Sequence, residues 1–165
     1  MRAIRILSFA LLLLALPAAA QTTFDWSMVG STGIVPDPGA GHEFTGPSFK
    51  HSSFRTGTLR ARYPVTNTYG SSSDDSPAWT TLWASYLDNS SSGSVTVKLF
   101  KVDDCSNTET LLCTITSSDD SSSQCSSCSF SSSDIDFANN SYYIEVAIAR
   151  TTTAASEQLH VVGIQ

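Results

Sequence analysis

Four cysteines carry the most reactive side chains of this sequence, and all of them lie between residues 105 and 128. They are Cys105, Cys113, Cys125 and Cys128. An even number of cysteines in a protein exported to an oxidising compartment favours disulfide bonds, and four cysteines allow three pairings. We predict the pairs Cys105–Cys113, which would close a hairpin loop, and Cys125–Cys128.

The Cys-Ser-Ser-Cys motif at residues 125–128 also has the spacing of a redox dithiol or of one arm of a zinc site. A thioredoxin-type dithiol lies at a helix N-terminus, which lowers the thiol pKa, whereas the serines around this motif give no helix signal. A zinc site of four cysteines would require two short Cys-x-x-Cys arms, and the sequence has one. The motif therefore favours a structural disulfide, with the dithiol and the zinc site as alternatives.

Side chains suited to hydrolysis are present, but their spacing matches no hydrolase motif. A serine nucleophile needs a base and an orienting acid, and the sequence has no Gly-x-Ser-x-Gly elbow. A glycosidase needs two carboxyl groups at a fixed separation, and nothing pairs the glutamates in the sequence. The histidines and glutamates are His42, His51, His160, Glu43, Glu109, Glu145 and Glu157. We assign no catalytic residue and predict that the protein is not an enzyme.

Three acidic doublets interrupt the apolar segments: Asp74-Asp75, Asp103-Asp104 and Asp119-Asp120. Calcium takes oxygen ligands from loops of this kind, and we name Asp103 and Asp104 as the candidate ligands of a structural calcium ion. The alternative is that the doublets only form turns, because aspartate readily accepts hydrogen bonds from its own backbone. The sequence indicates no other cofactor.

Two tryptophans, Trp79 and Trp83, are four residues apart in a segment with strand character. Side chains at i and i+4 of a strand point to the same side, so we expect both rings on one face with Thr81 between them. Such a pair would form a flat platform for a polysaccharide. The other interpretation places both tryptophans in the core, and we favour it because a small all-β domain needs its large aromatic side chains inside.

Alternating apolar and polar residues predict strands through most of the chain, and no segment has a sustained helical period. The predicted strands are Phe24–Val29, Glu43–Phe49, Thr58–Thr66, Trp79–Asp88, Ser94–Val102, Leu111–Ile115, a segment ending at Ile135–Phe137, Tyr142–Ile148 and Leu159–Ile164. Serine runs at 71–73, 90–92, 121–123 and 131–133 separate them as loops. We predict an all-β fold: one antiparallel, jelly-roll-like β-sandwich of about eight to nine strands.

The first twenty residues read as a signal peptide, with Arg2 and Arg5 before the apolar run Ile6–Leu16 and a small-residue cleavage site at Ala18–Ala20. We therefore expect a secreted or periplasmic domain over residues 21–165. Seven basic residues then face fifteen acidic ones, a net charge of −8. This balance argues against nucleic acid as a partner, and we expect no membrane span in the mature chain.

Two segments carry a resemblance. Tyr86-Leu-Asp-Asn-Ser-Ser-Ser-Gly-Ser-Val-Thr-Val-Lys-Leu and Asp136-Phe-Ala-Asn-Asn-Ser-Tyr-Tyr-Ile-Glu-Val resemble parts of small exported bacterial β-sandwich proteins of uncharacterised function. The resemblance extends from about Ala61 to the end of the chain. It implies a fold and no site residues.

Together these patterns predict a secreted, non-catalytic β-sandwich that serves as a surface, extracellular-matrix or assembly component. The alternative function is a carbohydrate-binding module that uses Trp79 and Trp83, and a hydrolase without a recognisable motif ranks third. The partners that we expect are a polysaccharide or further copies of the chain.

Overall fold

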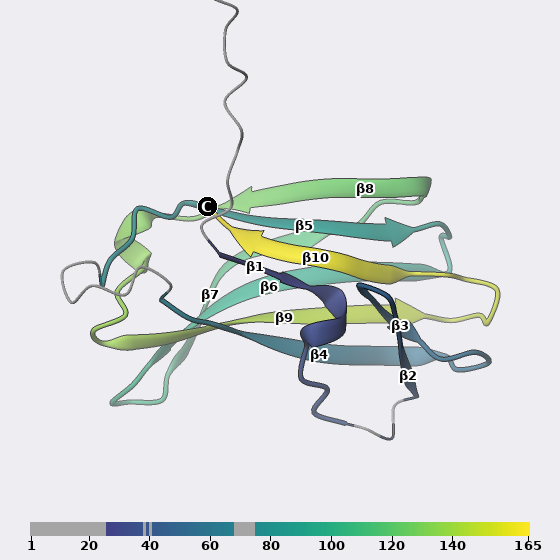
Figure 1. Cartoon of the computed structure of the whole chain (residues 1–165), viewed down its shortest axis with the longest axis horizontal. Coiled ribbons are helices and arrows are strands. Elements are labelled where there is room, and N and C mark those ends of the chain that lie inside the picture. The colour runs from purple at the N-terminus through teal and green to yellow at the C-terminus, as the bar shows by residue number, and fades with distance from the viewer. Residues whose placement is uncertain (1–25, 38, 40, 68–74) are drawn as a thin grey trace, which may run out of the picture.

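The chain folds as two antiparallel β-sheets packed face to face (Figure 1). The computed structural model describes residues 26–37, 39, 41–67 and 75–165. The predicted signal peptide, residues 1–20, lies outside the described residues, as does Asp74 of the first acidic doublet. No helix in the described ranges has the length and apolar character that a membrane span requires.

Sheet A, the larger sheet, has six strands. They are β1 (Trp26–Val29), β2 (His42–Thr45), β3 (Ser48–His51), β5 (Thr81–Asp88), β8 (Asp120–Ser129) and β10 (Gln158–Ile164). Sheet B has four strands: β4 (Gly57–Val65), β6 (Gly93–Asp103), β7 (Glu109–Thr116) and β9 (Asn140–Arg150). Two short 3-10 helices, η1 (Gly30–Thr32) and η3 (Ser132–Asp134), lie in the connections.

The strand order confirms the predicted jelly roll. Sheet A contains the order β3-β10-β5-β8, and sheet B has the order β4-β9-β6-β7. The chain therefore passes repeatedly from one sheet to the other, as two four-stranded sheets of a jelly roll require. Strand β2 extends sheet A beyond β3, and β1 pairs with β10 on the same edge as β3.

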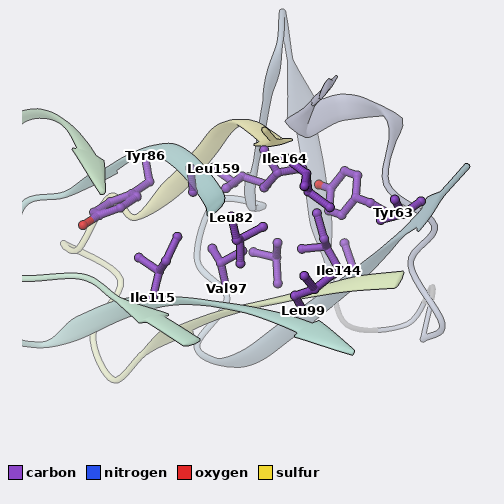
Figure 2. Packing of buried hydrophobic residues seen from close by; sticks show 14 of the residues in the cluster. Tyr63, Leu82, Tyr86, Val97, Leu99, Ile115, Ile144, Leu159 and Ile164 are labelled. Atoms are coloured by element: carbon purple, nitrogen blue, oxygen red, sulfur yellow. The ribbon is translucent and has the colours of Figure 1, made fainter. Parts of the chain in front are cut away.

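The core lies between the sheets, and both sheets contribute alternate residues to it (Figure 2). In β9 the buried residues are Tyr142, Ile144, Val146 and Ile148, which confirms the predicted alternation. Opposite them, β5 contributes Leu82, Ala84 and Tyr86. Strict period-two burial on both sheets explains why the pattern could be seen in the sequence.

Three strand predictions differ from the structure. The segment predicted as one strand, Glu43–Phe49, is a hairpin, because Gly46 takes a left-handed φ of 57° that permits a tight turn between β2 and β3. The serines at 121–123, predicted as a loop, lie in β8, which pairs along the length of β5. The predicted strand that ends at Ile135–Phe137 is absent, because the chain forms the 3-10 helix η3 at Ser132–Asp134, closed by a capping box of Ser131 and Asp134. The described residues therefore contain ten strands.

The predicted disulfide pairing is wrong. Cys113 of β7 is bonded to Cys128 of β8, with 6.0 Å between their Cα atoms, and the thiols of Cys105 and Cys125 are free. Cys125 and Cys128 are three residues apart in one extended strand, where side chains point to opposite faces and the Cα atoms are too distant for a bridge. The observed bond instead links the edge strand of sheet B to the edge strand of sheet A.

Candidate functional site

The two tryptophans that suggested a sugar platform lie on opposite sides of sheet A. Trp79 is 1% exposed and belongs to the core, whereas Trp83 is half-buried on the side of β5 that faces away from Leu82 and Ala84. Strand β5 begins only at Thr81, so the alternation assumed between residues 79 and 83 does not hold. The core interpretation is therefore correct for Trp79, and a platform made by both rings is excluded.

Trp83 is surrounded by small residues on the outer face of sheet A. Its cross-strand neighbours are Gly163 of β10 and Ser127 of β8, and Ser27 of β1 follows Gly163 in the same row. This row therefore offers one aromatic ring and two serine hydroxyl groups, and it carries no charge.

The side chain of Asp103, one of the two candidate calcium ligands, bonds the backbone of its own turn. Asp103 Oδ1 accepts hydrogen bonds from the backbone N–H groups of Cys105 (3.0 Å) and Ser106 (2.7 Å). The bond from Ser106 leads the causes that hold the pKa of Asp103 below its usual value. Asp104 accepts a bond from the Ser141 hydroxyl. Within the part of the chain that the structure describes, no three or more His, Cys, Asp or Glu side chains gather as metal ligands do.

The outer face of sheet B carries the richest arrangement of polar and aromatic side chains. The strand register places side chains from four strands in two adjacent rows. The charged row consists of Arg62, Glu145, Lys98 and Thr114, and the aromatic row consists of Pro64, Tyr143, Phe100 and Leu111. Each row crosses the strands, so neither can be seen as a local sequence motif.

Glu145 organises the charged row together with Arg60 from the next position on the same face of β4. Arg60 Nη1 donates a hydrogen bond of 2.7 Å to Glu145 Oε1, and Arg62 Nη2 lies 3.6 Å from Glu145 Oε2. Both guanidinium groups remain about half exposed. The carboxylate thus holds two arginines side by side, and about half of each arginine side chain remains exposed to solvent.

In the aromatic row, Tyr143 and Phe100 stack with their ring centroids 5.1 Å apart and their planes 16° from parallel. The Arg62 guanidinium lies over the Tyr143 ring at 4.9 Å, a cation–π distance. Leu111 continues the row and is 49% exposed. An apolar strip therefore runs directly beside the arginines.

A pocket of about 300 Å³ opens at the β4 edge of this face. Its lining residues are Pro36, Asp37, Thr58, Arg60, Arg62 and Glu145. The wall that contains Pro36 is fixed by a two-way backbone bridge, in which Ile34 and Arg62 each donate to the other's carbonyl at 2.8 Å. The pocket is therefore a part of the folded sheet edge.

This face gathers three of the seven lysines and arginines that follow residue 25, namely Arg60, Arg62 and Lys98. Three acidic side chains accompany them: Glu145 pairs with the arginines, Glu109 accepts a hydrogen bond of 3.0 Å from the Tyr143 hydroxyl, and Asp37 lines the pocket.

The alternation of the predicted strands Tyr142–Ile148 and Thr58–Thr66 implies that Glu145 points outward and that Arg60 and Arg62 share one side of their strand, and the structure has them so. The sequence does not show that these two strands are neighbours.

Comparisons with known proteins give little beyond the fold. No family model matches the sequence, and no curated protein matches it. A solved structure titled "CBM4 structure and function" is similar to this chain with 10% sequence identity and a TM-score of 0.38, over 85% of this chain and 86% of that one.

Proposed function

We propose that this protein is an exported, non-catalytic β-sandwich that binds an acidic polysaccharide on the outer face of sheet B. The observation that carries the proposal is the pair of adjacent rows, in which half-exposed arginines lie beside stacked aromatic rings. Sugar rings pack their C–H groups on aromatic side chains, and their oxygen atoms accept hydrogen bonds from guanidinium groups.

The half-exposed arginines favour a ligand that carries anionic groups. An overall acidic protein repels a polyanion from most of its surface, while Arg60, Arg62 and Lys98 offer cationic groups to carboxylates or sulfates on this face. Arginine binds such groups in a bidentate fork, which adds geometric selectivity to the attraction. A uronate or sulfated glycan therefore fits this face better than a neutral glycan.

Binding without catalysis agrees with the shape of the face. The two rows lie on a sheet surface that is open along the strands, and this suits a segment of an extended polymer. Retention on a matrix polysaccharide would make the protein a surface or matrix component, as the sequence suggested. The signal-like residues 1–20 and the Cys113–Cys128 bond support an oxidising, exported location.

Affinity electrophoresis in gels that contain polygalacturonate tests the proposal, with dextran as the neutral polymer. The wild-type protein should be retarded by polygalacturonate and not by dextran. The double variant Arg60→Ala with Arg62→Ala should lose at least about tenfold in affinity, which corresponds to about 1.4 kcal/mol. The retardation should weaken as salt is added.

Two matched variants separate this face from the rest of the molecule. Arg55→Ala removes an exposed arginine that lies off this face and should leave the retardation unchanged. Trp83→Ala tests the outer face of sheet A. If Trp83→Ala abolishes binding while the double arginine variant retains it, the glycan binds sheet A and the proposed site is wrong.

A further inference from the structure

Strand β8 is the outermost strand of sheet A on the side away from β2, and no strand of the described residues continues the sheet beyond it (Figure 1). From Ser123 to Ser129 it pairs residue by residue with β5. An edge strand presents a row of backbone N–H and C=O groups on its open side, and another strand can pair with them. The open side of β8 is therefore an interaction surface unless something covers or blunts it.

The hydrogen bonds of β5 show which residues of β8 direct their backbone groups to that open side. Thr81 of β5 exchanges backbone hydrogen bonds of 2.9 Å and 3.0 Å with Gln165, which follows β10. Backbone groups alternate between the two neighbouring strands along an antiparallel strand. The residues of β5 that bond to β8 are therefore the even-numbered ones, and the Phe130 N–H, which donates to the Thr80 carbonyl at 2.9 Å, has the same phase.

The partners of those even-numbered residues on β8 are Gln124, Ser126 and Cys128. The backbone groups of the residues between and beside them point away from β5, namely those of Ser123, Cys125, Ser127 and Ser129. In the described part of the chain, no backbone hydrogen bond from outside the β5–β8 pairing reaches these four residues. Their side chains are exposed, small and uncharged, so they leave room for a strand at the usual spacing of about 4.8 Å.

The other edge strands carry features that discourage strand addition. Strands β1 and β2 have only four residues each. Strand β4 contains Pro64 and is bridged by Ile34. In β7 the pairing with β6 skips Leu112, which makes a β-bulge. From Ser123 to Ser129, β8 has no proline, no charge and no bulge, so it is the edge that these devices leave unprotected.

We propose that a second copy of this chain binds here, with the two β8 strands antiparallel about a twofold axis near Ser126. In this register Ser123 lies opposite Ser129 of the second copy, and Cys125 lies opposite Ser127. The four residues with open backbone groups on one copy therefore meet the same four on the other, as a twofold interface requires.

Charge favours a second copy at this edge over other parts of the surface. The chain is acidic, so two copies repel each other over most of their surfaces. The segment from Ser123 to Ser129 carries no charged side chain, and pairing through it brings no like charges into direct contact. A second copy thus supplies a strand of matching length, phase and neutrality.

Sedimentation equilibrium of the mature protein between about 10 µM and 1 mM tests the proposal. The paired surface is short, so we expect a weak dimer with a Kd on the order of 100 µM. Ser127→Pro removes an N–H on the open side of β8 and no hydrogen bond to β5, and it should weaken dimerisation at least about tenfold. Ser127→Ala keeps that N–H and should dimerise like the wild type.

Ser127→Asp is a second variant, which does not alter the backbone. It places like charges close to the twofold axis, so it should weaken the dimer at low salt and recover as salt is added. A variant that carries both Cys105→Ser and Cys125→Ser should still dimerise. A wild-type monomer at about 1 mM, unchanged dimerisation of Ser127→Pro, or loss of the dimer in the cysteine variant would each overturn the proposal.

Amide hydrogen exchange of the wild-type protein tests the register without any substitution. Exchange at Cys125 and Ser127 should slow several-fold when the concentration rises from about 50 µM to 1 mM, because their N–H groups are bonded only in the dimer. Gln124 and Ser126 bond to β5 in both states, so their exchange should change much less. Protection that increases with concentration at β4 or β7 instead would place the contact elsewhere and overturn the proposal.

Discussion

The interior between the sheets and the outer face of sheet B are built from the same strands, yet they differ in how their residues are related. In β9, Ile144 and Val146 point inward and have aliphatic neighbours on every side, while Tyr143 and Glu145 point outward. An inward side chain could be replaced by another apolar side chain of similar volume and would still pack among aliphatic neighbours. Each outward position has a specific partner on another strand: Arg60 and Arg62 for Glu145, and Phe100 for Tyr143.

The two sides of the sheet therefore depend on different features of the sequence. The interior depends on alternation within single strands, whereas the outer face depends on which strands are neighbours and in which register. The binding site that we propose therefore lies on the side that the core does not constrain. Paired substitutions, one inward and one outward, test that conclusion.

The largest effect is expected within β9. Val146→Asp places an unpaired charge among fully buried apolar residues and should unfold the domain, a loss of more than about 4 kcal/mol. Glu145→Ala, one residue away and outward, should cost about 1 kcal/mol or less, because its arginine partners are half exposed. Urea unfolding curves of both variants measure this, and a folded Val146→Asp protein would mean that the strand faces the other way.

The two tryptophans give the second comparison. Trp79→Ala should lower stability by roughly 3–5 kcal/mol, since it removes a buried ring that packs edge-on against Phe137. Trp83→Ala should cost no more than half as much, because that ring is only half buried. Chemical denaturation of the two variants gives both values. Similar losses would show that the outer face of sheet A is covered in solution.

The third comparison concerns the cysteines. Cys113→Ser removes the bond that closes a segment of 15 residues and should cost about 3 kcal/mol. Cys125→Ser, on the outward side of β8, should leave stability nearly unchanged. Mass spectrometry after thiol alkylation without reduction should count two free thiols, and a count of zero would contradict the free state of Cys105 and Cys125.

The smallest expected effect is a change in stability with pH. It is compared for a buried acid, Glu157, and a more exposed one, Glu43. Burial raises the pKa of Glu157 above its ordinary value of 4.5, so its contribution to stability is present below pH 4.5 and lost as the pH rises through the raised pKa. Glu157→Gln should therefore gain stability relative to the wild type between pH 4.5 and 8.

Glu43 gives the opposite control. The Thr45 hydroxyl, with Lys50 second, lowers the pKa of Glu43, so its contribution is present above pH 4.5 and lost as the pH falls. Above pH 4.5 the Glu43→Gln variant should therefore be less stable than the wild type, and this difference in the free energy of unfolding should disappear as the pH falls. Unfolding free energies measured both above and below pH 4.5 decide the signs, and parallel curves for both variants would contradict them.

The sequence predicted the fold well where burial on one side left an alternating pattern. Strand β9 and the inward residues of β5 could be recognised because apolar side chains recur every second position. Strand β8 could not, because its serines have low strand propensity and it forms through pairing with β5, far away in the sequence. The boundary of β5 at Thr81 likewise moved Trp79 out of the alternation.

The candidate sites were less accessible to prediction. The outward direction of Glu145 could be inferred, but its arginine partners are 83 and 85 residues away and meet it only in the folded register. Glu157 shows no sequence signal at all, because its burial follows from packing against Gly93 of the other sheet. Sites assembled from several strands require the topology first.

The Cys113–Cys128 bond has a consequence for the survival of the protein after cleavage. The connection between β7 and β8, residues 117–119, lies inside the segment that the bond closes. A protease that cuts this connection once would therefore separate no fragment, because the polypeptide remains covalently joined through the two sulfur atoms. The nicked protein would keep β8 tethered to its neighbours and would divide into two pieces only when the bond is reduced.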